Sequence, residues 1–428
     1  MKQLKVIGRT SSFSFKGTKT DLKTIGKILN ADTILEGSIQ KSGNRIRITA
    51  QLINASDGFH IWSQRYDREM DDIFALQDDI CSKIAEHLKL TLLQDHKTAV
   101  EKRPTESLEA YEQFLKGEFY YKKYSPEGFQ KAIEYFTKAT EIDPKYEDPW
   151  WSLGVAYWET QAWLPIQEKA VIEKARMCAK KAIDIDEKSA NGHFLLALIS
   201  MNADWDWEKA GTELALGNKY NRTNNFWFLE LEAWYRGMLF GDFDFAISRL
   251  QKGIENDPLS IFYLLFLALM YLHGLRDYEK ARMVLNRILE LESHYTEAWN
   301  PMCLSYLYEG NYGPAEEYAR KYYNVLEGKG QGALNLMMCL AASGKKEEAW
   351  QLYQRVLDKV AINEFTPSLH AKANAYLGRP DEAFSHLHKA IDGKDIWLPM
   401  TLKYSPEWDL LRSDPRFQKV LERMNFPK

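Results

Sequence analysis

The sequence is short of the residues that mark secreted or membrane proteins. It has four cysteines in 428 residues, and they lie far apart, so we expect buried thiols in a reducing compartment rather than disulfides or metal ligands. No apolar run approaches the roughly 18 residues that a membrane span needs, and the N-terminus lacks a charged region followed by an apolar one. These absences predict a soluble, cytoplasmic chain.

An excess of basic residues is also missing. Lys and Arg total 56 against 60 for Asp and Glu, so bulk electrostatics gives no indication of nucleic-acid binding. The sequence contains no G-x-S-x-G, no H-E-x-x-H and no paired C-x-x-C motif. The one glycine-rich run, residues 328–332, follows no predicted strand and therefore lacks the context of a phosphate loop.

Two patterns that suggest a metal site have simpler explanations. His386 and His388 are two apart on a predicted helix, about 200° around its axis, and cannot share one ion. Asp204 and Asp206 flank a tryptophan in a turn, where helix capping explains them better than coordination. We therefore predict a non-enzymatic chain with no cofactor, no metal ion and no catalytic residue.

What the sequence does contain is a repeated pair of amphipathic helices. In residues 296–327, Trp299, Met302, Cys303 and Tyr306 recur at spacings of three and four, and a second apolar series follows a Gly-containing turn. This pattern predicts a helical hairpin of about 34 residues. Its alternation of small and aromatic residues resembles the tetratricopeptide repeat.

The second helix of this hairpin recurs along most of the chain. Each copy has small or apolar residues at spacings of three and four, and Pro144 and Pro258 follow two of them, where a residue without an N–H ends one repeat and begins the next. The eight sets are Ala132, Phe136, Ala139; Ala175, Ala179, Ala182; Ala210, Leu214, Gly217; Ala246, Leu250, Gly253; Ala281, Leu285, Ile288; Ala315, Ala319, Tyr322; Ala349, Tyr353, Val356; and Ala383, Leu387, Ala390.

Residues 1–95 have a different pattern of apolar and polar residues, which predicts a small α+β domain. We expect a short strand at Val6 and Ile7, a helix over 21–30 and further strands joined by turns at 42–44 and 57–58. Ile46, Ile48, Ala50 and Leu52 alternate with polar residues, as in a half-buried antiparallel strand, and a helix with apolar residues from Ile73 to Leu88 follows. Residues 96–104 read as a linker.

Several runs in this domain are similar to a known family. LEGSI, RIRITAQLI, G-x-x-I-W-S-x-x-Y-D and I-F-A-L-Q-D-x-I resemble the bacterial domain related to the amino-terminal domain of TolB and to FlgO, over roughly residues 4–92. The resemblance implies tetratricopeptide repeats after the domain and a signalling module, such as a nucleotide cyclase or a winged-helix region, before it. The family pattern begins with a strand and a helix ahead of Leu4. Either Met1 is an internal start, or the sheet is incomplete.

The predicted fold is mainly α. It is a right-handed α-α superhelix of about eight tetratricopeptide hairpins over 105–395, preceded by an α+β domain over 1–95 with a three- to four-stranded sheet. Residues 396–428 form a capping segment, in which Phe417, Val420, Leu421 and Met424 make an apolar stripe that would cover the last repeat. An anion site at Arg45, Arg47 and Arg65 is the alternative to a solvated sheet face with cross-strand partners.

We predict a protein-protein interaction scaffold or adaptor, with the concave face of the first helices as its binding surface. That face is apolar, so either it accepts a protein or peptide partner, or a tight superhelix buries it. The alternatives are the regulatory half of a signalling protein and a helical-repeat enzyme. An incomplete sheet would also permit self-association. The predicted protein-binding residues are Trp151, Trp158, Phe194, Leu198, Met201, Leu229, Leu265, Leu269, Leu272, Leu304 and Leu307.

Overall fold

A computed structural model describes residues 5–69, 73–88, 105–123, 125–162, 169–221, 227–359 and 365–427. The chain divides into two compact units. Unit 1 comprises Met1–Glu112 and Glu255–Ser260, and unit 2 comprises Gln113–Ile254 and Ile261–Lys428. Each unit has its own core and is described separately.

Unit 1 is built on a three-stranded antiparallel sheet in the order β1-β2-β3. The alternation predicted for β2 is confirmed, because Ile46, Ala50 and Leu52 are buried with Trp62 and Tyr66 of β3 against Leu76 of α3. The element bounds are α1 Arg9–Phe13, α2 Leu22–Leu29, β1 Thr33–Ser42, β2 Arg45–Asn54, β3 His60–Glu69 and α3 Ile73–His87.

The predicted strand at Val6 and Ile7 is wrong. Both residues lie in irregular chain, and Val6 is exposed. The neighbouring backbone bonds elsewhere in unit 1, since the N–H of Gly8 donates to the carbonyl of Asn256 at 2.6 Å. The predicted linker, 96–104, lies outside the described residues.

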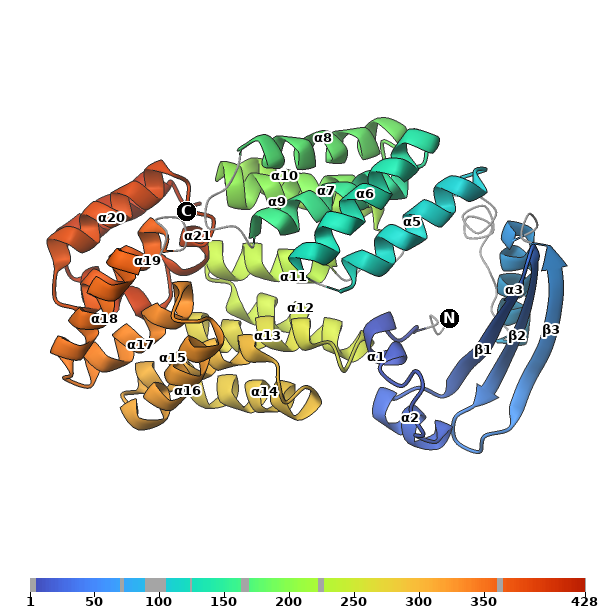
Figure 1. The fold of residues 1–428 in the computed structure, drawn as a ribbon, viewed down its shortest axis with the longest axis horizontal. Helices are drawn as coiled ribbons and strands as arrows, with labels where there is room; N and C mark the ends of the chain where they lie inside the picture. Colours follow the sequence, from blue (N-terminus) through green and yellow to red (C-terminus); the bar gives the residue numbers. More distant parts are fainter. Residues whose placement is uncertain are drawn as a thin grey trace. The chain divides into compact units, whose positions relative to one another are not determined.

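Unit 2 is a right-handed superhelix in which the described helices pair into eight hairpins (Figure 1). The first helix of the first hairpin, α5, begins in unit 1. The pairs are α5 Leu108–Tyr121 with α6 Pro126–Ile142; α7 Glu147–Ala162 with α8 Lys169–Ile185; α9 Ala190–Ile199 with α10 Trp207–Tyr220; α11 Trp227–Trp234 with α12 Phe243–Asn256; α13 Ile261–Leu269 with α14 Tyr278–Leu291; α15 Trp299–Glu309 with α16 Tyr312–Val325; α17 Gly330–Ala342 with α18 Lys346–Lys359; and α19 Pro367–Tyr376 with α20 Pro380–Asp392.

The small and apolar residues of the second helices hold the superhelix together. All 24 residues of the eight predicted sets are buried. Small residues matter because helices can then approach closely; a Cβ on Gly217 would lie 2.6 Å from the ring of Phe228, and one on Gly253 would lie 2.9 Å from that of Tyr263. The repeat pattern thus corresponds to the packing that it predicted.

The C-terminal segment, residues 394–427, follows the last hairpin. It contains α21 Leu398–Thr401, η6 Pro406–Trp408, α22 Asp409–Arg412 and α23 Pro415–Met424. Phe417, Val420 and Met424 of α23 are buried against Phe384 and Leu387 of α20, so the predicted cap on the last repeat is confirmed. This segment also reaches earlier hairpins, which the sequence did not predict.

Candidate functional site

The predicted binding residues lie on the first helices of hairpins 2 to 6, but most of them are core. None of the eleven is exposed. Those that are buried are Trp158, Phe194, Met201, Leu229, Leu272, Leu304 and Leu307, and those that are partly exposed are Trp151, Leu198, Leu265 and Leu269. The prediction of a continuous accessible apolar surface is therefore wrong for the seven buried residues, and the other alternative, a tight superhelix, describes them.

The physical reason is that successive first helices pack against one another. Leu272, Leu304 and Leu307 belong to one buried cluster that extends to Leu334 of α17. In the earlier hairpins Phe194 packs against Phe228, with ring centroids 5.0 Å apart, and against the edge of Trp151. Each of these side chains therefore fills the space between neighbouring repeats, and the four partly exposed residues lie at the margins of the clusters.

Hairpins 3, 4 and 5 share an unusual feature, because the first helix of each ends in a π-helical turn. These turns are η2 Ser200–Asp204, η3 Tyr235–Leu239 and η4 Met270–Leu275. A π turn is wider than an α turn, and such turns are frequent at functional sites. Here three of them occur at corresponding places in consecutive repeats.

Each of the three π turns contacts the C-terminal segment. The ammonium group of Lys394 donates to the carbonyl of Asp204 at 2.7 Å, and that of Lys403 donates to the carbonyl of Leu239 at 2.6 Å. In the third turn Nδ1 of His273 lies 2.8 Å from the hydroxyl of Ser405. The C-terminal segment therefore follows the row of π turns, one contact for each repeat.

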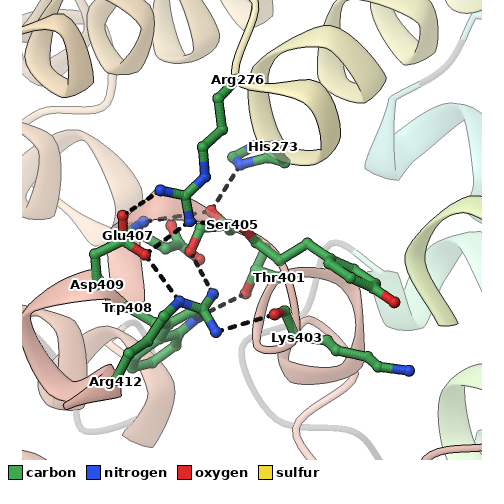
Figure 2. A network of polar contacts seen from close by, with 10 residues as sticks. His273, Arg276, Thr401, Lys403, Ser405, Glu407, Trp408, Asp409 and Arg412 are labelled. Atoms are coloured by element: carbon green, nitrogen blue, oxygen red, sulfur yellow. Dashed lines mark hydrogen bonds and ion pairs between the residues drawn. The ribbon is translucent and has the colours of Figure 1, made fainter. Parts of the chain in front are cut away.

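The contact at η4 extends into a larger polar network (Figure 2). Arg276 donates two hydrogen bonds to the carboxylate of Asp409, at 2.6 and 2.8 Å. Arg412 donates to the same carboxylate and to the carbonyls of Lys403 and Ser405. Figure 2 shows both guanidinium groups directed at Asp409, so the two arginines hold the chain around α22 from opposite sides.

Beneath this network lies a buried ion pair. The ammonium group of Lys372, on α19, is 2.7 Å from Oε1 of Glu407, and the two side chains are 6% and 3% exposed. Burial alone would raise the pKa of Glu407, but the positive charge of Lys372 and the hydrogen bond that it donates outweigh burial and hold that pKa below its usual range. The ammonium group also lies over the ring of Trp408, which is fully buried.

His273 completes this cluster. Burial is the largest of the effects that together lower the pKa of its imidazole to about 4; the charge of Glu407 opposes this shift, and the charge of Lys372 adds to it. The ring is therefore neutral at pH 7. The imidazole is paired with Ser405, and Lys372 is paired with Glu407, which is typical of a structural cluster rather than of a group that exchanges protons with a substrate.

The far end of the C-terminal segment contacts hairpin 3. The indole N–H of Trp207 donates to the carbonyl of Met424 at 3.3 Å, and the Trp207 ring stacks on Phe426 with centroids 5.6 Å apart. Asp206 caps α10, so the capping explanation is confirmed for this aspartate, whereas Asp204 pairs with Arg176. The segment thus joins hairpins 3, 4 and 5 to hairpin 8.

Sequence reasoning missed these anchoring residues. A signal was present at Lys372, which is the one charged residue in the small-residue run Ala371–Ala375 of a first helix. A lysine at such a position needs a buried partner. Nothing in the sequence identified that partner as Glu407.

Among the described residues no group of three or more His, Cys, Asp and Glu is placed to hold a metal ion. One carboxylate pair exists on the first helices of hairpins 2 and 4: burial and the charge of Glu159 raise the pKa of Glu230 well above its usual range. All four cysteines are free; three are buried as predicted, whereas Cys81 is exposed.

In unit 1 two of the three arginines considered for an anion site, Arg47 and Arg65, have a carboxylate partner. The guanidinium of Arg47 lies 2.6 Å from the carboxylate of Asp67, and that of Arg65 lies 3.7 Å from it. This supports the solvated face with cross-strand pairs over an anion site. By contrast, β1 is exposed along most of its length, including Leu35 and Ile39.

No family model matches the chain. One curated protein, "Putative adenylate cyclase 3" of Rhizobium meliloti (strain 1021), is 31% identical over 195 residues, which is 45% of this chain and 33% of that protein. The chain thus spans about a third of the length of that relative.

Solved structures of helical-repeat proteins are also similar to this chain. Yeast Tom70 is 18% identical, with a TM-score of 0.44 over 74% of this chain and 68% of that one. YrrB, described as a TPR protein with an unusual peptide-binding site, is 15% identical, with a TM-score of 0.31 over 44% and 91%. Human IFIT1 in complex with PPP-AAAA is 16% identical, with a TM-score of 0.41 over 76% and 78%. At these scores the likeness says nothing about what this chain binds.

Within the described part of the chain no helix is long and apolar enough to cross a membrane.

Proposed function

We propose that the chain is a non-enzymatic protein-protein interaction scaffold or adaptor, whose protein or peptide partner binds the concave side of the repeats. The observation that carries the proposal is the partial exposure of Trp151, Leu198, Leu265 and Leu269 on the first helices, beside apolar residues of the same helices that are buried. An array of helical hairpins offers an extended surface, and apolar side chains at its margins suit an apolar segment of a partner.

Photo-cross-linking tests this proposal. A photoreactive amino acid at Leu269 should form an adduct with one specific protein in cells that express the full chain, and Leu265→Lys, one helical turn away, should remove that adduct without lowering the melting temperature. The matched control is the same photoreactive residue at Leu410, which is exposed on α22. Identical adducts at both positions, or none at Leu269, would refute the proposal.

A second proposal is self-association through the N-terminal sheet. It is supported by β1, an edge strand of ten residues that is exposed along most of its length. An unpaired, exposed strand edge is a template for pairing with another chain. Light scattering of the full chain tests it, since a monomer at all micromolar concentrations would contradict it.

The relation to the Rhizobium protein supports a third proposal, that this chain is the regulatory half of a signalling protein. In that case the output module, for example a nucleotide cyclase or a winged-helix region, lies on a longer natural chain or on another one. We expect the chain alone to form no cyclic AMP from ATP. Appreciable cyclase activity would overturn both this proposal and the non-enzymatic scaffold.

The free cysteines suit a cytoplasmic location.

A further inference from the structure

The sheet of unit 1 is covered on only part of its apolar face. On β2 and β3, Leu52, Trp62 and Tyr66 are buried by α3. The residues of β1 that share this face are Leu35 and Ile39, paired with Leu52 and Ile48, yet they are 53% and 68% exposed. The apolar face therefore extends beyond the helix that covers it.

The two edges of the sheet differ in their protection. The outer edge at β3 carries charged residues at four of its last five positions: Arg65, Asp67, Arg68 and Glu69. Such charges and bulges are the usual devices that prevent a strand edge from pairing with another chain. In contrast, β1 pairs with β2 over ten consecutive residues without a bulge and contains two charged residues, Glu36 and Lys41. Thus β1 is the edge that the described part of the chain leaves open to pairing.

We infer that β1 pairs antiparallel with β1 of a second copy of this chain, about a two-fold axis at Gly37, to give a six-stranded sheet. This inference rests on the proposed self-association and specifies its geometry. A two-fold axis normal to the sheet keeps the faces of the two sheets aligned, so each residue opposes one of the same face. With Gly37 on the axis, Leu35 opposes the partner's Ile39, and Glu36 opposes the partner's Ser38.

This register suits the side chains better than its neighbours do. Leu35 and Ile39 of both copies then form one apolar patch across the axis, where cross-strand apolar pairs stabilise a sheet. Gly37 opposes its own copy and has no side chain to obstruct the approach. An axis at Glu36 would oppose two like charges. An axis at Ser38 would oppose Leu35 with the partner's Lys41.

Two substitutions of exposed isoleucines test the interface in the full chain. Ile39→Lys should convert the dimer to a monomer in light scattering, with the melting temperature of the monomer unchanged because the side chain is exposed. Ile61→Lys, on β3, is the matched control: Ile61 is also exposed, and its substitution should leave the dimer intact. A dimer that survives Ile39→Lys would overturn the inference.

Disulfide cross-linking tests the register. In a Cys81→Ser background, which removes the exposed native thiol, a mixture of Glu36→Cys and Ser38→Cys chains should form a cross-linked heterodimer on oxidation, whereas either variant alone should not. Cross-linking of Ser38→Cys with itself would overturn the register while self-association stands. A wild-type chain that is monomeric would overturn both the register and the proposed self-association. The pairing partner of β1 would then be a strand other than its own copy.

Discussion

Hairpins 3 to 5 and hairpins 6 to 8 are built from the same helix pair, but their first helices end differently. In the earlier group they end in the π turns η2, η3 and η4. In the later group the first helix has no π turn and ends one or two residues before a glycine with positive φ, 83° at Gly310, 87° at Gly344 and 74° at Gly378; of the earlier group, hairpin 4 also has such a glycine, Gly241, after η3. The π turns are the places where Lys394, Lys403 and Ser405 dock.

The two groups of hairpins also differ in how they contact the C-terminal segment and in how exposed their apolar residues are. Hairpins 6 and 7 share one buried cluster with residues of hairpins 5 and 8, and hairpin 8 contacts the C-terminal segment through α19 and α20. Hairpins 3 to 5 present turn atoms to that segment and retain three of the four partly exposed residues of the predicted surface, Leu198, Leu265 and Leu269. Part of the predicted surface is thus accessible in hairpins 3 and 5, whereas its residues in hairpin 6, Leu304 and Leu307, are buried.

The largest expected effect is the difference in the free energy of unfolding between a variant at a buried leucine and one at a partly exposed leucine. Leu304→Lys places an ammonium group in the core of hairpin 6 and should cost about 5 kcal/mol or more, because the cavity and the unpaired charge add. Leu269→Lys, in hairpin 5, should cost less than about 1 kcal/mol, since its stem can lie along the surface with the charge in water. Urea denaturation compares them. Equal costs would show that the two groups do not differ in this way, and the double variant should unfold because of Leu304 alone.

The next effect compares two ion pairs that hold the C-terminal segment. Glu407→Leu leaves the buried ammonium group of Lys372 without a partner and should cost about 3 to 5 kcal/mol. Asp409→Asn weakens the half-exposed pair with Arg276 and should cost at most about 1 kcal/mol.

A double variant is the control for this comparison. Lys372→Met with Glu407→Leu should recover most of the stability, because apolar residues often replace a buried ion pair at little cost. If the double variant is as unstable as Glu407→Leu alone, the loss arises from packing around Trp408 rather than from the uncompensated charge.

A third prediction concerns pH. In the unfolded chain His273 takes up a proton as the pH falls through about 6.5, whereas the folded chain resists protonation down to about 4. The free energy of unfolding should therefore decrease as the pH falls through this window, by up to roughly 3 kcal/mol from this residue. Burial also lowers the pKa of His370 to about 4, so it acts in the same direction. His273→Asn, whose amide can keep the bond to Ser405, should flatten the dependence; an unchanged slope would contradict the assignment.

The contacts within hairpins could be predicted from the sequence, whereas the contacts of hairpins 3 to 5 with the C-terminal segment could not. The sets such as Ala281, Leu285 and Ile288 were identifiable because their packing depends on residues three and four apart, and all of them are buried. The cap formed by Phe417, Val420 and Met424 was identifiable for the same reason.

The residues that dock the C-terminal segment do not recur at a fixed spacing in the sequence. Trp207 and Met424 are 217 positions apart, and Lys403 and Leu239 are 164 apart. These contacts depend on how far the superhelix turns over several repeats, which no local pattern encodes. The burial of Leu304 and Leu307 was left open for the same reason: their exposure depends on the distance between successive first helices.

The smallest expected effect tests the turns themselves. Gly310→Ala forces a Cβ into a left-handed conformation at the end of α15 and should destabilise the chain by about 1 kcal/mol. Gly313→Ala, three residues later in the first turn of α16, should instead stabilise it by up to about 1 kcal/mol, because Gly313 has nothing within 4 Å of the added Cβ and alanine favours a helix. The two variants add the same methyl group at neighbouring positions, so thermal denaturation isolates the conformational contribution. A stabilising Gly310→Ala would mean that the later hairpins do not need their left-handed glycines, and the contrast with the π turns would then arise from contacts with the C-terminal segment rather than from turn geometry.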